Sequence, residues 1–102
     1  MRPIHLAQLD KRRPVLVLTR EVARPRLRRV TVAPITTTVR GIATELAVGR
    51  ANLLDHDSVV SLDNVQTILA ADLREQVGWL LPHQEPALAL AIQAAYDLED
   101  TL

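Results

Sequence analysis

Short runs of alternating hydrophobic and polar residues fill the first two thirds of the chain. Alternation with a period of two predicts β-strands, because successive side chains of a strand point to opposite faces. The segment 14–18 is instead continuously apolar, which is typical of a strand buried on both faces. We expect seven strands and one helical turn. The expected strands cover residues 3–9, 14–18, 28–35, 42–48, 58–62, 65–70 and 77–81, and the helical turn covers 71–76.

The C-terminal part of the chain has a helical period. Between residues 85 and 99, apolar side chains recur every three or four positions, so they would share one helix face. Pro86 stands in the first turn, where a proline is tolerated. The expected apolar face contains Leu88, Ala91, Ile92, Ala95 and Leu98. Many short strands followed by one helix predict an α+β, mainly β fold. We expect one domain, residues 1–102, with a small curved antiparallel sheet or partial barrel and the C-terminal helix packed on it.

Charge is unevenly distributed along the chain. Residues 1–50 hold eleven of the twelve basic and three of the twelve acidic residues, a net charge of 11 − 3 = +8, and residues 51–102 carry −8. A basic half is suited to attract a phosphate backbone, and the two halves could equally pair inside the fold. The densest basic stretch, residues 24–29, is either a solvated loop or a phosphate-contacting arm.

The amino-acid composition excludes or disfavours several kinds of functional site. The absence of cysteine excludes disulfides and thiolate ligands, and the three histidines lack the spacing of a helical zinc pair, so we expect no metal site. Trp79 and Tyr96 are the only aromatic residues, which argues against base stacking as the main mode of RNA binding. We expect Trp79 in the core or in a dimer contact. Without a signal-peptide pattern or a long apolar run, the expected location is cytoplasmic.

Two segments beside buried strands carry candidate chemistry. Arg12 and Arg13 directly precede the apolar strand 14–18, and a threonine run with Arg40 follows the strand ending near residue 35. An arginine braced by a buried strand can bind a phosphate through two parallel hydrogen bonds. Threonine hydroxyls can bond to phosphate oxygens or to ribose. Each segment also has an ordinary interpretation, namely a surface ion pair for Arg13 and turn formation for the threonines.

Three segments resemble the MazF-type toxin endoribonucleases, the MazF/PemK-like family of type II toxin–antitoxin systems. Residues 13–18 (Arg-Pro-Val-Leu-Val-Leu) resemble the arginine–proline–apolar strand of that family. Residues 32–37 (Val-Ala-Pro-Ile-Thr-Thr) resemble its strand ending in threonine, and residues 58–68 resemble its strand, turn and Thr-Ile stretch. The order and spacing of the three segments agree over nearly the whole chain.

The resemblance implies a fold, partners and a site. The fold is a small SH3-like barrel, and the working form is a homodimer with an RNA groove across its interface, blocked by a cognate MazE-like antitoxin. The reaction is sequence-specific cleavage of single-stranded RNA without metal or cofactor. Arg13 and Thr36 match the family's catalytic arginine and threonine. The other side chains expected to contact RNA are Lys11, Arg12, Thr37, Thr38 and Arg40.

The chain also departs from the family pattern. Many relatives have a longer first loop than residues 9–12, and Gln66 stands where relatives often carry a basic residue. Leu53 occupies a turn position that glycine would suit better.

The absence of metal-site and nucleophile motifs favours attack of the ribose 2′-OH on the neighbouring phosphorus, leaving a 2′,3′-cyclic phosphate. The residues leave the general base open among Asp10, Glu21 and His5. An alternative function is that of a non-catalytic toxin of the same barrel class that binds a protein such as a DNA topoisomerase. A third is an inactive RNA-binding barrel.

Overall fold

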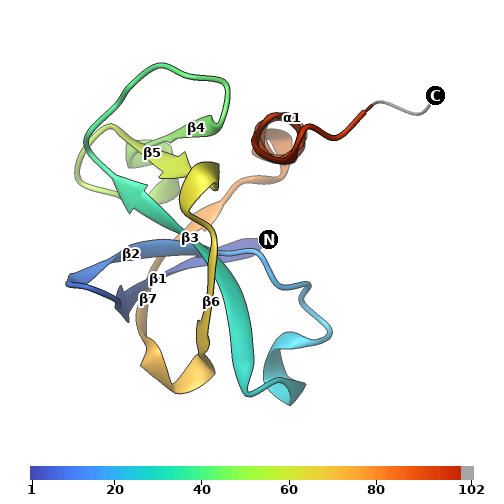
Figure 1. Ribbon diagram of the computed structural model, residues 1–102. Helices are drawn as coiled ribbons and strands as arrows, with labels where there is room; N and C mark the ends of the chain where they lie inside the picture. Colours follow the sequence, from blue (N-terminus) through green and yellow to red (C-terminus); the bar gives the residue numbers. More distant parts are fainter. Residues whose placement is uncertain (100–102) are drawn as a thin grey trace.

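The computed structural model describes residues 1–99, so the last three residues of the expected domain, 100–102, lie outside the described part. Within it, seven strands are followed by one α-helix (Figure 1). The strands are β1 (Arg2–Gln8), β2 (Arg12–Val17), β3 (Arg29–Thr36), β4 (Glu45–Val48), β5 (Ser58–Ser61), β6 (Gln66–Leu69) and β7 (Leu73–Leu80), and the helix is α1 (Glu85–Tyr96). The α+β, mainly β class predicted from the sequence is confirmed.

The strands form one strongly curved antiparallel sheet. Its order is β4-β5-β3-β2-β1-β7, and β6 pairs with the first half of β3. β3 therefore turns from β6 to β5 along its length, which makes it the common strand of the two halves of the sheet. β7 pairs with β1 through two register shifts, and such irregularities bend a strand and increase its twist. The result is the expected partial barrel (Figure 1).

Two hydrophobic clusters stabilise this arrangement. Val30 and Val32 of β3 pack with Ala7, Val15 and Val17 in one cluster. Ala33 and Ile35 belong to the other cluster, which also contains residues of β4, β5 and α1. The helix is held on the second cluster by Leu88 and Ala91, both 2% exposed, with Ile92 and Ala95 partly buried beside them. The helix thus covers the β4–β5 side of the sheet.

The structure corrects several expected boundaries. Residues 42–44 do not belong to a strand, because β4 begins only at Glu45. The helical turn expected at 71–76 is a 3₁₀ turn at Ala70–Asp72, and β7 begins at Leu73, four residues before the expected strand. The helix ends at Tyr96 because Asp97 adopts a left-handed conformation (φ +52°).

Two expectations about apolar side chains also change. Leu98 was expected on the buried helix face but lies beyond the helix end and is 55% exposed. Trp79 is 37% exposed and does not join either core cluster, so the core half of that expectation is wrong. The dimer-contact half stays a prediction.

A buried asparagine connects the β4–β5 segment to the start of the helix. Asn52 is 1% exposed, and its Nδ2 donates to the backbone oxygen of Trp79 at 2.8 Å and to Oε1 of Gln84 at 2.6 Å. Gly78 permits this approach, because a Cβ there would lie 2.0 Å from the Asn52 carbonyl oxygen. Leu53, which follows Asn52 in the chain, has φ +68°, which confirms that its turn favours glycine.

Candidate active site

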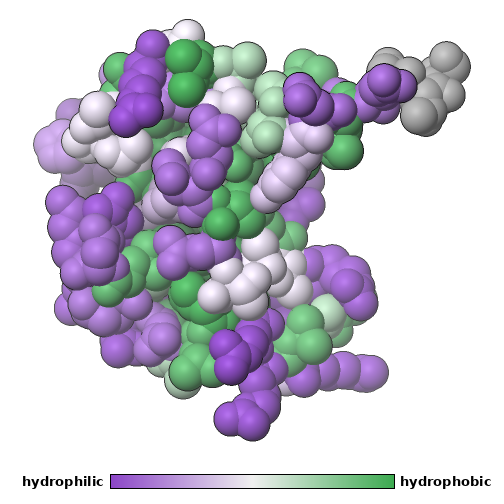
Figure 2. Space-filling model, viewed as in Figure 1, coloured by the Kyte–Doolittle hydropathy of each residue, from purple (hydrophilic) through white to green (hydrophobic). Residues whose placement is uncertain are grey.

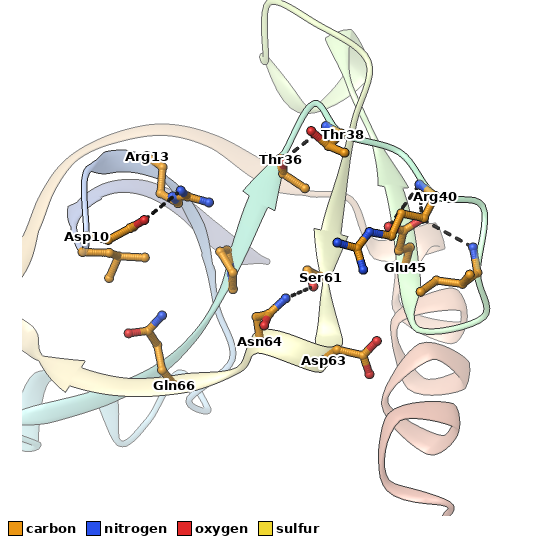
Figure 3. A pocket seen from close by; sticks show the side chains of 13 residues that line it. Asp10, Arg13, Thr36, Thr38, Arg40, Glu45, Ser61, Asp63, Asn64 and Gln66 are labelled. Carbon is orange, nitrogen blue, oxygen red and sulfur yellow. Dashed lines mark hydrogen bonds and ion pairs between the residues drawn. The ribbon is translucent and has the colours of Figure 1, made fainter.

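A cavity of about 580 Å³ opens where four parts of the chain meet (Figure 3). These are the β1–β2 turn, the end of β3, the loop between β3 and β4, and the connection from β5 to β6. Because the pairings β3–β5 and β3–β6 bring residues 61–66 beside β3, the cavity combines side chains that are far apart in the sequence. Its lining is mostly polar and includes both arginines and carboxylates.

Arg13 lines the cavity from a fixed backbone position. It is the second residue of β2 and is paired with Ala7 of β1. Its Nη2 donates to Oδ2 of Asp10 at 3.3 Å, and its Nε is buried without a hydrogen-bond partner. The side chain of Arg13 is 24% exposed, compared with 74% for that of Asp10, so this ion pair is solvent-screened and weak. The Nη groups therefore remain able to donate to a group bound in the cavity, whereas the buried Nε without a partner is costly.

Thr36 is the last residue of β3 and lines the same cavity. Its Oγ1 accepts a hydrogen bond from the backbone N–H of Thr38 at 3.1 Å. That bond holds the oxygen in place and leaves the hydroxyl's own proton to donate to a bound group. The hydroxyl and the guanidinium of Arg13 thus supply two kinds of donor to one cavity (Figure 3).

The loop of residues 37–44 brings Thr38 and Arg40 to the cavity. Its conformation is held by the carboxylate of Glu45, whose Oε1 accepts from the backbone N–H groups of Arg40 at 3.1 Å and Gly41 at 2.9 Å. Gly41 has φ +71°, a conformation suited to glycine. At the far end of the loop, Oγ1 of Thr44 donates to Oδ2 of Asp63 at 2.6 Å.

The β5–β6 connection forms the remaining side of the cavity. Nδ2 of Asn64 donates to Oγ of Ser61 at 2.8 Å, which holds the turn at Leu62–Asn64. Gln66 lines the cavity from the first position of β6. Sequence reasoning gave no cavity role to Glu45, Ser61, Asp63 or Asn64. Only the non-local pairing of β3 with β5 and β6 places them there, and no local motif marks it.

The structure brings together four of the seven predicted site residues, and three lie outside the lining. Arg13, Thr36, Thr38 and Arg40 line the cavity, whereas Lys11, Arg12 and Thr37 do not. Arg12 precedes Arg13 in β2 and so points to the opposite face, where it pairs with Glu75 of β7. A role of these three residues in RNA contact stays a prediction.

The three candidate bases also separate in space. Asp10 lines the cavity beside Arg13. His5 and Glu21 line a different cavity of about 480 Å³, and Nδ1 of His5 lies 2.7 Å from the carbonyl oxygen of Arg74. Among the three, therefore, only Asp10 can reach a group bound between Arg13 and Thr36.

Within residues 1–99, no group of three or more histidine or carboxylate side chains is arranged to hold a metal ion. No helix in the same range is long and apolar enough to cross a membrane.

Comparison with known proteins assigns this chain to a family. The family model of PemK-like, MazF-like toxins of type II toxin–antitoxin systems matches residues 3–95. The curated endoribonuclease MazF3 of Mycobacterium tuberculosis is 67% identical over 99 residues, which cover 97% of this chain and 96% of that protein. The resemblance noted in the sequence is thereby confirmed.

Solved structures agree with this assignment. The M. tuberculosis toxin MazF-mt6 superposes with a TM-score of 0.94 at 65% identity, covering 96% of this chain and 99% of that one. A mycobacterial endoribonuclease solved in complex with its cognate antitoxin has a TM-score of 0.86 at 23% identity, covering 96% and 94% of the two chains. At that identity the second match supports the fold alone.

Proposed function

The chain belongs to the family of PemK-like, MazF-like toxins of type II toxin–antitoxin systems, and we propose that it is an endoribonuclease that cuts single-stranded RNA at a specific sequence. The activity class follows the curated endoribonuclease to which it is 67% identical. The observation that supports the proposal is that the guanidinium of Arg13 and the hydroxyl of Thr36 line one polar cavity (Figure 3).

The proposed reaction is an internal transesterification. The ribose 2′-oxygen forms a bond to phosphorus while the bond from phosphorus to the 5′-oxygen breaks, which leaves a 2′,3′-cyclic phosphate and a free 5′-hydroxyl. The phosphorane formed on the way carries additional negative charge. Arg13 can bind two of its oxygens through its Nη groups, and Thr36 can donate one further hydrogen bond.

Two protons move in this reaction. The 2′-hydroxyl loses one to a base, and the 5′-oxygen gains one as it leaves. We assign the base role to Asp10, because its carboxylate lies beside Arg13 while Glu21 and His5 line another cavity. A carboxylate is a modest base, so its value here depends on position next to the reacting hydroxyl.

The assembly is also part of the proposal. We infer a homodimer whose two copies frame the RNA groove, a cognate MazE-like antitoxin that covers it, and action in the cytoplasm. A mycobacterial endoribonuclease has been solved in complex with its cognate antitoxin, and a Deinococcus radiodurans MazF has been solved with MazE. The fold of this chain matches both, with TM-scores of 0.86 and 0.73.

The test is end-mapping of single-stranded RNAs incubated with the purified protein, with and without a chelator. We expect cuts at one short sequence, cyclic-phosphate ends and no effect of the chelator. Arg13→Ala should fold and dimerise as the wild type does but cut almost no RNA. Fully active Arg13→Ala, or loss of cutting in chelator, would refute the mechanism. Growth inhibition without any RNA cutting would instead support the non-catalytic alternative.

A further inference from the structure

A second concentration of positive charge lies outside the cavity. The connection from β2 to β3, together with the first residue of β3, contains Arg20, Arg24, Arg26, Arg28 and Arg29. Glu21 is the only acidic residue there, so residues 18–29 carry a net charge of 5 − 1 = +4. Five like charges so close together repel one another, and a polyanion would relieve that repulsion.

These arginines have few partners in the fold. Nε of Arg24 donates to the backbone oxygen of Thr19 at 2.8 Å, which holds that side chain against its own loop. Arg26, Arg28 and Arg29 are exposed, and none of the ion pairs found within residues 1–99 includes them. In Figure 2, strongly hydrophilic side chains project from the lower part of the molecule, where Figure 1 places the start of β3. Their guanidinium groups are therefore available to a ligand.

β6 connects this surface to the cavity. Its first residue, Gln66, lines the cavity, and its last, Leu69, is paired with Arg29. Three residues of a strand span about 10 Å. Next along the chain, the backbone N–H of Ala70 donates to the carbonyl oxygen of Arg28 at 2.8 Å. An RNA strand that leaves the cavity along β6 thus arrives at Arg28 and Arg29 (Figure 1).

The route over β6 presents hydrogen-bonding groups and no negative charge. Thr67 of β6 is exposed, and its Oγ1 lies 3.2 Å from Oγ1 of Thr31 on β3. β6 itself, Gln-Thr-Ile-Leu, contains no acidic residue. A phosphate backbone crossing this strand therefore meets hydroxyl and amide groups before it reaches the arginines.

We propose that Arg26, Arg28 and Arg29 form a second contact surface for the phosphate backbone of the RNA, beyond the nucleotides held in the cavity. This inference rests on the proposed function, because it assumes that RNA occupies the cavity. From Thr36 to Arg29, β3 spans about 24 Å, which at about 3.4 Å per nucleotide of stacked strand is about seven nucleotides. RNAs that extend at least that far from the cut site on one side gain the contact, and shorter ones do not.

The test compares two substrates with the same cut site, one with about three nucleotides on each side and one with about twelve. For Arg28→Gln/Arg29→Gln we expect the KM for the long RNA to rise about tenfold, with kcat and the KM for the short RNA unchanged. The slope of log KM against log salt for the long RNA should fall by about 1.4, since each phosphate contact on a single strand contributes about 0.7. The matched control compares Arg28→Gln with Arg50→Gln, which removes one positive charge from the segment between β4 and β5 and should leave all these values unchanged.

Binding measured without cleavage separates this inference from the proposed function. Fluorescence anisotropy of the labelled long RNA in an Arg13→Ala background should show the same tenfold weakening for the double variant. If Arg28→Gln and Arg50→Gln weaken binding equally, or if neither does, the second contact surface does not exist. If RNA binding is unchanged but binding of an acidic polyglutamate peptide falls, the surface serves an acidic protein segment and the RNA assignment is wrong. Wild-type protein that binds the RNA in this way but never cuts it would overturn the proposed function alone.

Discussion

The β1–β2 turn and the β3–β4 loop border the same cavity but are held in different ways. The turn spans only residues 9–11, and the Arg13 that follows it is already fixed by strand pairing with Ala7. The loop spans residues 37–44 and depends on two carboxylates, those of Glu45 and Asp63, for its conformation. The group proposed to act on phosphorus therefore comes from a strand, whereas Thr38 and Arg40, which are proposed to contact RNA, come from a loop. Strands place a side chain more accurately than loops do.

The largest effect should come from the strand-held group. Arg13→Lys keeps the charge but loses the planar fork and the buried Nε donor, so we expect kcat to fall about 100-fold with a smaller change in KM. Single-turnover cleavage at saturating enzyme measures this. If the lysine variant is as active as the wild type, a positive charge alone is enough to stabilise the phosphorane. The precise placement of Arg13 by its strand would then not matter for catalysis.

Removing the hydroxyl at the end of β3 should have the next largest effect. Thr36→Val keeps the shape of the side chain but removes both the proposed donor and the acceptor for the Thr38 N–H. We expect kcat to fall about tenfold, as for the loss of one or two neutral hydrogen bonds. Thr36→Ser is the matched control and should retain most activity. An inactive serine variant would show that the methyl group, and not the hydroxyl, matters.

Releasing the loop should act mainly on binding. Glu45→Ala removes the acceptor for the N–H groups of Arg40 and Gly41, so we expect KM to rise about fivefold while kcat stays within a factor of two. Glu45→Gln retains an acceptor oxygen and should recover part of the loss. Added acetate should also improve Glu45→Ala, because successive backbone N–H groups form an anion-binding site. A fall in kcat with unchanged KM would mean that the loop takes part in the chemistry.

The smallest effect is expected on the side of the molecule away from the cavity. Leu53→Gly relieves a left-handed conformation that costs about 1–2 kcal/mol, offset by about 0.5–1 kcal/mol of extra freedom in the unfolded chain. We expect the free energy of unfolding to rise by about 0.5 kcal/mol and Tm by about 3 °C, with cleavage unchanged. Thermal unfolding monitored by circular dichroism measures this. An altered kcat in this variant would show that overall stability, and not loop position, governs activity.

The hydrophobic pattern of the sequence predicted those strands and the helix whose boundaries depend on their own residues. The strands at residues 14–18 and 28–35 and the start of the helix agree with β2, β3 and α1 within two residues. The alternation at 42–44 was misleading because those residues belong to a loop that Glu45 and Asp63 hold. The start of β7 was missed because Arg74, Glu75 and Gln76 are exposed, and only pairing with β1 makes this stretch a strand.

The site shows the same division. Resemblance to a family indicated Arg13 and Thr36, and the structure brings both to one cavity. Asn64 and Gln66 could not be placed in it from the sequence, because their position depends on pairing between segments about thirty residues apart. The polar lining of the cavity is thus a property of sheet topology more than of any motif.

The crossing of backbones at Gly78 and Asn52 has a consequence for how this protein can diverge. Every other amino acid at position 78 would push a Cβ into the carbonyl oxygen of Asn52, and so would separate the last strand from the amide that also holds Gln84 at the entrance to the helix. Its neighbour Trp79 faces outward and meets no such obstacle. Neighbouring positions of one strand are therefore constrained in different ways: residue 78 by the backbone that crosses it, and residue 79 only by what its side chain contacts.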